Sequence, residues 1–172
     1  MRRRGGSASQ GQAMGFVDFV VTDSSPRPGP SLPKPLSTLG VLNASELDAA
    51  PRREFHFESA MHQHSINGRY FDMHRVDEQV PLGKTEVWRF INDGPLPHPV
   101  HVHAGQFRVV SRRGGRGRVE PWETGLKDTV LVFPDERVDV AVCFKRYKGL
   151  FLLHCHNLEH EDAGMMLNFE VT

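Results

Sequence analysis

The sequence predicts an all-β fold, either a β-sandwich or a β-barrel. From residue 53 onward it is a series of short segments that alternate apolar and polar residues or are mainly apolar. Turn residues such as "DGP", "RRGGRG" and "YKG" separate most of these segments, and short strands at this spacing are typical of sandwiches and barrels. We find no long amphipathic helix pattern and no internal repeat. The predicted strands are 53–59, 68–72, 84–93, 100–103, 106–112, 128–133, 137–144, 150–154 and 165–171.

The segments before residue 53 differ in composition from the rest. Residues 1–14 are rich in Gly, Ser, Gln and Arg and are expected to be disordered. The segment 15–22, "GFVDFVVT", predicts one strand that is cut off from the others. Five prolines follow within fifteen residues and predict an extended linker, which we place over residues 23–52. The one predicted helical turn is 43–50, capped by Asn43 or Ser45.

Composition narrows the class of protein. The 172 residues are enough for one ordinary domain with an extension. Lys and Arg together number 21, as do Asp and Glu, and this balance does not favour nucleic acid or a membrane surface as partner. No apolar run reaches transmembrane length. The basic start "MRRRGG" is not followed by an apolar signal-peptide core, so it predicts no export signal.

The candidate metal-binding side chains lie in two short stretches, 98–103 and 154–165. On a strand, successive side chains point to opposite faces, so residues two apart share a face. One face therefore carries the four imidazoles of His101, His103, His154 and His156. Cys155 faces the other way, together with whichever of His98, His160 and Met165 fold back to it. We expect Pro99 to interrupt any regular strand next to His98.

Each set of side chains has a metal that suits it. One thiolate, two imidazoles and one thioether form the ligand group of a blue-copper electron-transfer site, in which methionine is the weak axial ligand. Four imidazoles suit further copper ions. The backbone of Cys155 would then join the two metal centres covalently. A zinc site built from Cys155 and histidines and a fortuitous cluster are the alternatives, although the combined spacing H-x2-H-x-H and H-C-H-x3-H-x4-M is highly specific.

The remaining cysteine and histidines carry no motif. Cys143, in "VAVCF", is predicted to be a small buried apolar residue. We exclude a disulfide between Cys143 and Cys155 because it would consume the thiolate ligand. "HQH" at 62–64 is interpreted as an ordinary surface pair, with metal binding on a strand face as the alternative.

Several motifs together resemble one protein family. They are "INGRYFDM" (66–73), "EVWRFIN" (86–92), "HPVHVHAGQF" (98–107), "WETGLKDTVLV" (122–132) and "HCHNLEHEDAGMM" (154–166). Residues 53–172 thereby resemble the C-terminal cupredoxin domain of bacterial laccase-like multicopper oxidases, the branch of cuprous oxidases, spore-coat laccases and bilirubin oxidases. The resemblance implies a cupredoxin-like Greek-key β-sandwich. It also implies that 23–52 is the connector between two cupredoxin domains and that 15–22 is the last strand of the preceding one.

The resemblance implies a role for each ligand. The type 1 copper would be bound by His98, Cys155 and His160, with Met165 as axial ligand. The type 2 copper would be bound by His101, and the paired type 3 coppers would be bound by His103, His154 and His156. Glu161 would relay protons to the oxygen site, or else is a solvated loop carboxylate. Asp128 is expected to be structural. The family usually has Gly after the third histidine, whereas this chain has Ala104 followed by Gly105, so we expect the flexible backbone position to have moved by one residue.

The implied activity is an oxidoreductase that takes single electrons from a phenol, a bilirubin-like pigment or Cu(I) and reduces O2 to water at a trinuclear copper site. Half of that site's histidines come from an N-terminal domain in the family, and residues 1–97 carry no such motif pair. Missing N-terminal cupredoxin domains or another chain are therefore expected to supply them. The alternative is a stand-alone blue-copper electron-transfer protein, which leaves four histidines unexplained. Relatives are mostly periplasmic or secreted, and this is the expected location.

Overall fold

The computed structural model describes residues 15–21, 29, 31–32, 34, 42–60 and 63–172. The chain divides into two units, Met1–Val41 and Leu42–Thr172, and each is considered by itself. Within the part of the chain that is described, none of the helices has both the length and the apolar character needed to span a bilayer.

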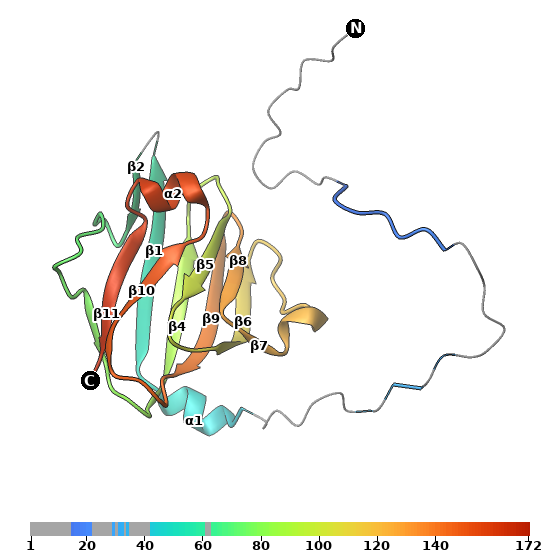
Figure 1. The fold of residues 1–172 in the computed structure, drawn as a ribbon. Coiled ribbons are helices and arrows are strands. Elements are labelled where there is room, and N and C mark those ends of the chain that lie inside the picture. The colour runs from blue at the N-terminus through green and yellow to red at the C-terminus, as the bar shows by residue number, and fades with distance from the viewer. Residues whose placement is uncertain (1–14, 22–28, 30, 33, 35–41, 61–62) are drawn as a thin grey trace, which may run out of the picture. The chain divides into compact units, whose positions relative to one another are not determined.

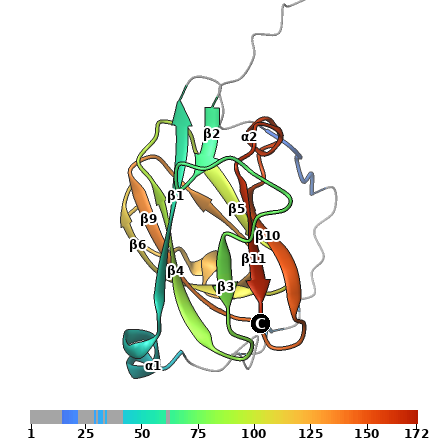
Figure 2. The same cartoon turned by 90° about the vertical axis from the view of Figure 1, so that its left-hand side faces the viewer.

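The second unit is a sandwich of two β-sheets (Figures 1 and 2), which confirms the predicted all-β class. The six-stranded sheet has the order β2-β1-β4-β9-β6-β7, and the five-stranded sheet has the order β3-β11-β10-β5-β8. The strands of the first sheet are β1 (Arg52–Ala60), β2 (Gln63–Ile66), β4 (Thr85–Asn92), β6 (Phe107–Gly114), β7 (Leu126–Lys127) and β9 (Glu136–Cys143). Those of the second are β3 (Glu78–Val80), β5 (His98–Val102), β8 (Thr129–Val132), β10 (Gly149–Cys155) and β11 (Met166–Val171).

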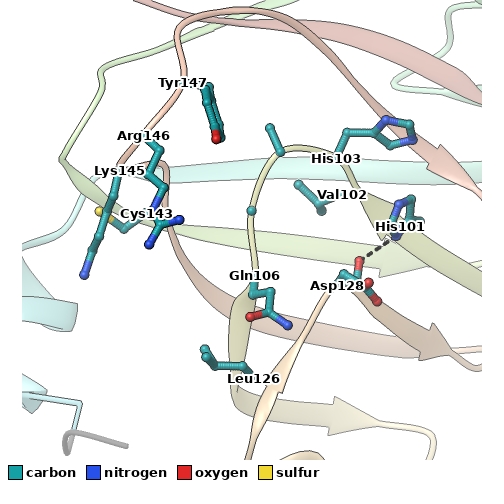
Figure 3. A pocket seen from close by; sticks show the side chains of 12 residues that line it. His101, Val102, His103, Gln106, Leu126, Asp128, Cys143, Lys145, Arg146 and Tyr147 are labelled. Carbon is teal, nitrogen blue, oxygen red and sulfur yellow. Dashed lines mark hydrogen bonds between the residues drawn. The ribbon is translucent and has the colours of Figure 1, made fainter.

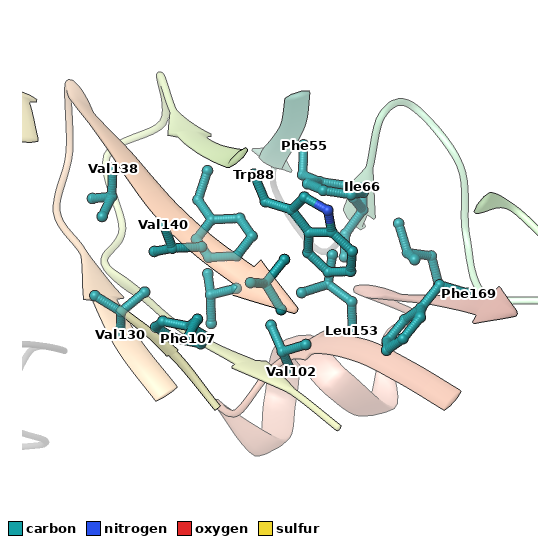
Figure 4. Packing of buried hydrophobic residues seen from close by; sticks show 14 of the residues in the cluster. Phe55, Ile66, Trp88, Val102, Phe107, Val130, Val138, Val140, Leu153 and Phe169 are labelled. Carbon is teal, nitrogen blue, oxygen red and sulfur yellow. The ribbon is translucent and has the colours of Figure 1, made fainter. Parts of the chain in front are cut away.

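The core lies between the sheets and is built from the alternate side chains of each strand (Figure 4). Trp88 of β4 is its largest member; its ring centroid lies 5.1 Å from that of Phe55 and 5.4 Å from that of Phe169. Tilted and edge-on pairs of this kind are the favoured aromatic geometries. Because β4 and β1 belong to one sheet and Phe169 to the other, this aromatic cluster joins the two sheets.

Among the described residues, three short helices lie outside the sheets: α1 (Ala44–Ala49), the 3-10 helix η1 (Pro121–Glu123) and α2 (Leu158–Asp162). The first was predicted, and Asn43 caps it, since its side chain accepts a hydrogen bond from the Ser45 N–H. The sequence pattern did not predict the other two, because each is a single short turn inside a motif that otherwise reads as a loop.

The predicted strand at 68–72 is wrong, whereas the strand at 15–22 stays a prediction. Residues 68–72 form a loop, with only an isolated bridge between Arg69 and Ile66; Asn67 and Gly68 both have positive φ and turn the chain there. Residues 15–21 adopt no regular secondary structure, and Phe16 and Phe19 are more than 90% exposed. A strand needs a neighbour to satisfy its backbone hydrogen bonds, and none of the described residues pairs with this segment; Thr22 and residues 1–14 lie outside the described part.

Candidate metal centre

The two histidine motifs lie on neighbouring strands of the five-stranded sheet. In the antiparallel register of β5 and β10, His101 stands opposite His154 and Val100 opposite Cys155. Residues directly opposite each other point to the same face. The pairing therefore places imidazoles on the outer face and Cys155, with the fully buried Val100, on the face toward the core.

The expected interruption of the strand at Pro99 is wrong. Strand β5 begins at His98 and runs through Pro99, which pairs with Leu131 of β8. A proline is tolerated near the first position of a strand, where its missing N–H is least needed, and its carbonyl oxygen accepts a hydrogen bond from the His156 N–H at 2.6 Å. The regular alternation extends to His98, so this side chain shares the core-facing side with Val100.

His98, Cys155 and His160 form the thiol–imidazole cluster, a buried group on the core-facing side. The Sγ of Cys155 lies 3.6 Å from the Nδ1 of His98 and 3.6 Å from the Nδ1 of His160. The two Nδ1 atoms are 3.1 Å apart. Burial raises the pKa of the Cys155 thiol to about 11 and lowers the pKa of His98 to about 3. Without a metal, the cluster thus holds a neutral thiol and two neutral imidazoles, and its three donor atoms converge on one point.

Helix α2 folds His160 and Met165 back to this cluster. Asn157 caps the helix by accepting a hydrogen bond from the Glu159 N–H. The Met165 N–H donates to the His160 carbonyl at 2.9 Å, and the Met165 carbonyl accepts from the Cys155 N–H at 3.1 Å. Met165 is fully buried in the same core as Cys155, so its backbone is tied to two of the three members of the thiol–imidazole cluster.

His101, His103 and His154 form the outer imidazole cluster on the opposite face. The Nε2 atoms of His103 and His154 are 3.1 Å apart. The Nδ1 of His101 lies 3.0 Å from the Asp128 carbonyl oxygen. The Nδ1 of His154 lies 3.1 Å from the Cys155 carbonyl oxygen. Because a carbonyl only accepts, both Nδ1 atoms carry the ring proton. The Nε2 of each of these two rings therefore carries a lone pair and no proton, the form that binds a metal ion.

His156 and Glu161 border the outer imidazole cluster. The His156 ring centroid lies 5.3 Å from that of His154 and 5.6 Å from that of His101, and the residue is exposed. An Oε2 atom of the half-buried Glu161 lies 3.4 Å from the Nδ1 of His154. The Asp128 side chain contributes no described contact to the cluster, whereas its main-chain oxygen orients His101.

Ser59 and His64, from the β1–β2 hairpin, contact the thiol–imidazole cluster. The sequence analysis missed Ser59 and interpreted His64 as a surface residue. The ring of His64 stacks on that of His160, with centroids 4.0 Å apart and an angle of 18°. His64 is 8% exposed, so the interpretation of "HQH" as a surface pair is wrong for this member, while His62 lies outside the described residues. The sequence offered one signal for this contact, the presence of His64. The segment around it, Gln63–Ile66, is too short and too polar for its pattern to predict a strand.

Cys143 is half-buried rather than buried. It lies beside a cavity of about 650 Å³ next to the outer imidazole cluster. The residues that line this cavity include His101, His103, Lys145 and Tyr147 (Figure 3). Cys143 and Cys155 are both free thiols, so the predicted lack of a disulfide between them is confirmed.

The loop after His103 keeps its unusual backbone at Ala104, which has a φ of 64°. The expectation that this position had moved to Gly105 is therefore wrong. Glycine at 105 is needed for a different reason, because a Cβ atom there would lie 3.2 Å from the ring of Phe144.

We predict that Ala104→Gly stabilises the fold. The left-handed conformation costs an L-residue about 1–2 kcal/mol, and the greater freedom of glycine in the unfolded chain offsets part of the gain, so the free energy of unfolding should rise by roughly 0.5–1 kcal/mol. Urea unfolding measures this. The matched control is Ala50→Gly, where φ is −68° and the same exchange should destabilise; a loss of stability in Ala104→Gly would contradict the prediction.

The buried His98 predicts a pH-dependent stability for the metal-free chain. Burial, and then the neighbouring His160 and His64, lower its folded-state pKa from 6.5 to about 3. Between these values the unfolded chain binds a proton that the folded chain does not. The contribution to stability is therefore complete above pH 6.5 and is lost as the pH falls toward 3. From pH 7 to pH 5 the loss should be about 2 kcal/mol for this group.

Urea unfolding in the presence of a chelator at pH 7 and pH 5 measures the effect. In His98→Gln this part of the pH dependence should disappear. Identical pH dependence in the two proteins would show that His98 is not held neutral by the fold.

The family model described as "Multicopper oxidase" matches residues 43–172. A laccase of Haloferax volcanii is 39% identical over 167 residues, which cover 91% of this chain and 28% of the relative. A bilirubin oxidase of Albifimbria verrucaria is 37% identical over 159 residues, covering 90% of this chain and 27% of the relative. The chain thus spans less than a third of the length of these curated relatives.

Solved structures agree with the sequence relatives. A multi-copper oxidase from Pediococcus acidilactici superposes with a TM-score of 0.75 at 36% identity, covering 84% of this chain and 30% of that one. The McoA multicopper oxidase from Aquifex aeolicus superposes with a TM-score of 0.73 at 32% identity, covering 83% of this chain and 33% of that one. The predicted cupredoxin-like β-sandwich is confirmed.

Proposed function

The chain belongs to the multicopper oxidase family, and from this premise we propose that it is the copper-binding C-terminal portion of a laccase-like oxidase. The observation that carries the proposal is the pairing of β5 with β10, because it builds two ligand clusters on opposite faces of the same two strands. A single residue, Cys155, belongs to one cluster and is bonded through its backbone to His154 and His156 beside the other.

The thiol–imidazole cluster is assigned to the type 1 copper. Its donors are one buried thiol and two buried, neutral imidazoles, with the fully buried Met165 tied to them through the backbone. A thiolate, two imidazoles and a weak thioether suit copper better than zinc, which favours four strong ligands. We therefore propose that His98, Cys155, His160 and Met165 would hold this ion.

The outer imidazole cluster is assigned to the oxygen-reducing site. We assign His101 to the type 2 copper and His103, His154 and His156 to the type 3 pair. The distance of 3.1 Å between the Nε2 atoms of His103 and His154 supports one ion shared by these two residues. The remaining ligands are proposed to come from N-terminal cupredoxin domains or from another chain, since the sequence of residues 1–97 shows no second motif pair.

Bound copper would supply one-electron acceptance at Cys155 and oxygen reduction at the outer cluster. The chain provides the connection between them: backbone bonds from Cys155 to His154 and His156, and a shorter route through the hydrogen bond from His154 Nδ1 to the Cys155 carbonyl. Glu161 is half-exposed and has an oxygen 3.4 Å from His154 Nδ1. It can take a proton from solvent and hold it beside the cluster that consumes protons.

The stand-alone blue-copper carrier is not favoured, because it has no use for the outer imidazole cluster. The reducing substrate is proposed to be a phenol, a bilirubin-like pigment or Cu(I), in keeping with relatives named laccase and bilirubin oxidase. A periplasmic or secreted location is proposed on the same resemblance.

Copper content and oxygen uptake together test the proposal. The chain should retain copper after dialysis against a weak chelator, and it should not consume oxygen with a phenolic donor, because its oxygen site is only half supplied. Failure to retain copper would refute the metal assignment. Oxygen uptake by this chain alone would refute the view that the oxygen site needs further ligands.

A further inference from the structure

Two side chains of the β1–β2 hairpin, Ser59 and His64, each contact one imidazole of the thiol–imidazole cluster. The Oγ of Ser59 lies 2.9 Å from the Nδ1 of His64 and 3.5 Å from the Nε2 of His98. The His64 ring lies flat against that of His160. The hairpin therefore contacts one imidazole by a hydrogen bond and the other by a stacked ring, and the two contacts are joined through Ser59.

The hydrogen bonds in this arrangement can have only one direction when His98 binds a metal. Its Nδ1 faces the Sγ of Cys155 and must be free of a proton to act as a ligand, so the ring proton is on Nε2. That N–H donates to the Ser59 oxygen. The Ser59 hydroxyl then donates to the Nδ1 of His64, whose own proton is on Nε2. The two donors between His98 and His64 each meet an acceptor, so the two bonds are consistent in direction.

Both imidazoles are buried, so protein groups must hold their outer edges, and among the described residues of the hairpin Ser59 and His64 make these contacts. His98 is 0% exposed and His160 is 1% exposed, so bulk water has little access to either ring. A metal-bound histidine is normally oriented by a partner on its second nitrogen, and that partner also makes the imidazole a stronger base. A stronger base favours Cu(II), the more highly charged state, over Cu(I).

On the premise of the type 1 assignment above, we propose that Ser59 and His64 are positioning residues of this copper site. Ser59 orients His98 through its Nε2, and His64 fixes the ring plane of His160 by stacking. Together they set the affinity of the site for Cu(II) relative to Cu(I), and hence its reduction potential.

The test uses Ser59→Ala and His64→Phe in the full 172-residue chain, loaded with Cu(II). Cu(II) affinity should fall about 10- to 100-fold in Ser59→Ala, the usual cost of losing such an orienting partner. Each selective tenfold loss of Cu(II) affinity raises the potential by about 59 mV for a one-electron couple. A redox titration that follows the thiolate-to-copper absorption band measures the potential, and the copper hyperfine splitting in EPR reports the ligand geometry. His64→Phe keeps an aromatic ring but removes the acceptor for Ser59, so it should shift both readouts in the same direction.

The control is Ser65→Ala, a serine of the same hairpin that bonds Glu58 at 3.0 Å and contacts neither imidazole. Its potential and EPR spectrum should match those of the unaltered chain. If Ser59→Ala and His64→Phe also match, or if their potentials fall, the inference is overturned while the copper site stands. If the unaltered chain shows no thiolate-to-copper band, the copper assignment fails and the inference with it. Should His64→Phe not fold, the small, half-buried Ser59→Ala decides alone.

Discussion

Replacement of Cys155 by serine is expected to abolish the intense thiolate-to-copper absorption of the copper-loaded chain. The hydroxyl of serine is a hard and weakly acidic donor, so it replaces the soft thiolate poorly as a ligand for copper. Losing a residue that only orients a metal ligand typically lowers metal affinity 10- to 100-fold. Losing the thiolate ligand itself should lower the copper affinity of this cluster by at least that factor. Absorption and EPR spectra of the two proteins, loaded under identical conditions, measure the change.

The outer imidazole cluster supplies an internal control for this variant. Its members face away from Cys155, and His101 and His154 are oriented by main-chain oxygens that the substitution leaves in place. Cys143→Ser is the matched external control, because Cys143 is the other free thiol and lies outside both clusters. Persistence of the band in Cys155→Ser, or its loss in Cys143→Ser, would overturn the assignment of the thiol.

Replacement of Arg112 by methionine is expected to destabilise the fold by about 3–5 kcal/mol, the usual cost of removing one partner from a buried ion pair. The Arg112 side chain is completely buried and bonds two carboxylates, Glu123 of η1 and Glu136 of β9. It also donates to the Leu131 carbonyl of β8 at 3.2 Å. Arg116 lies 3.4 Å from Glu136 and can compensate only partly, so methionine would leave buried charge without its partner.

Chemical unfolding at pH 7 measures this effect. The control is Arg137→Met, since Arg137 and Asp93 form an exposed pair of a kind worth no more than about 1 kcal/mol. The triple replacement of Arg112 by methionine with Glu123 and Glu136 by glutamine should recover much of the loss, because no charge is then buried unpaired. A loss in Arg112→Met no larger than that in Arg137→Met would show that the buried network contributes little.

The alternation of side chains along a strand was enough to sort the ligands before the structure was known. Cys155 and His154 point to opposite faces whatever strand lies next to them. The register that sets His101 against His154 could not be predicted, because it depends on pairing between segments some fifty residues apart. The error at Pro99 has a local cause: strand pattern alone does not show that a proline stands where its missing N–H is harmless.

His64 shows why contacts beyond the motif were missed. The strand that carries it has four residues, and three consecutive ones are buried, so neither alternation nor apolar content marks it. Its position over His160 arises from the packing of the hairpin on α2, a tertiary contact with no local signal. Helix α2 is similarly hidden, because its five residues form one capped turn.

A Cu(II) titration of this chain, followed by absorption and EPR, tests most directly whether Cys155 binds copper together with His98 and His160. Copper binding by these three residues predicts an intense thiolate-to-copper band that rises in proportion to added copper and saturates at one equivalent, with the narrow copper hyperfine splitting of a thiolate-bound ion. Copper bound without that band, and with the wide splitting of ions held only by nitrogen and oxygen, would contradict it.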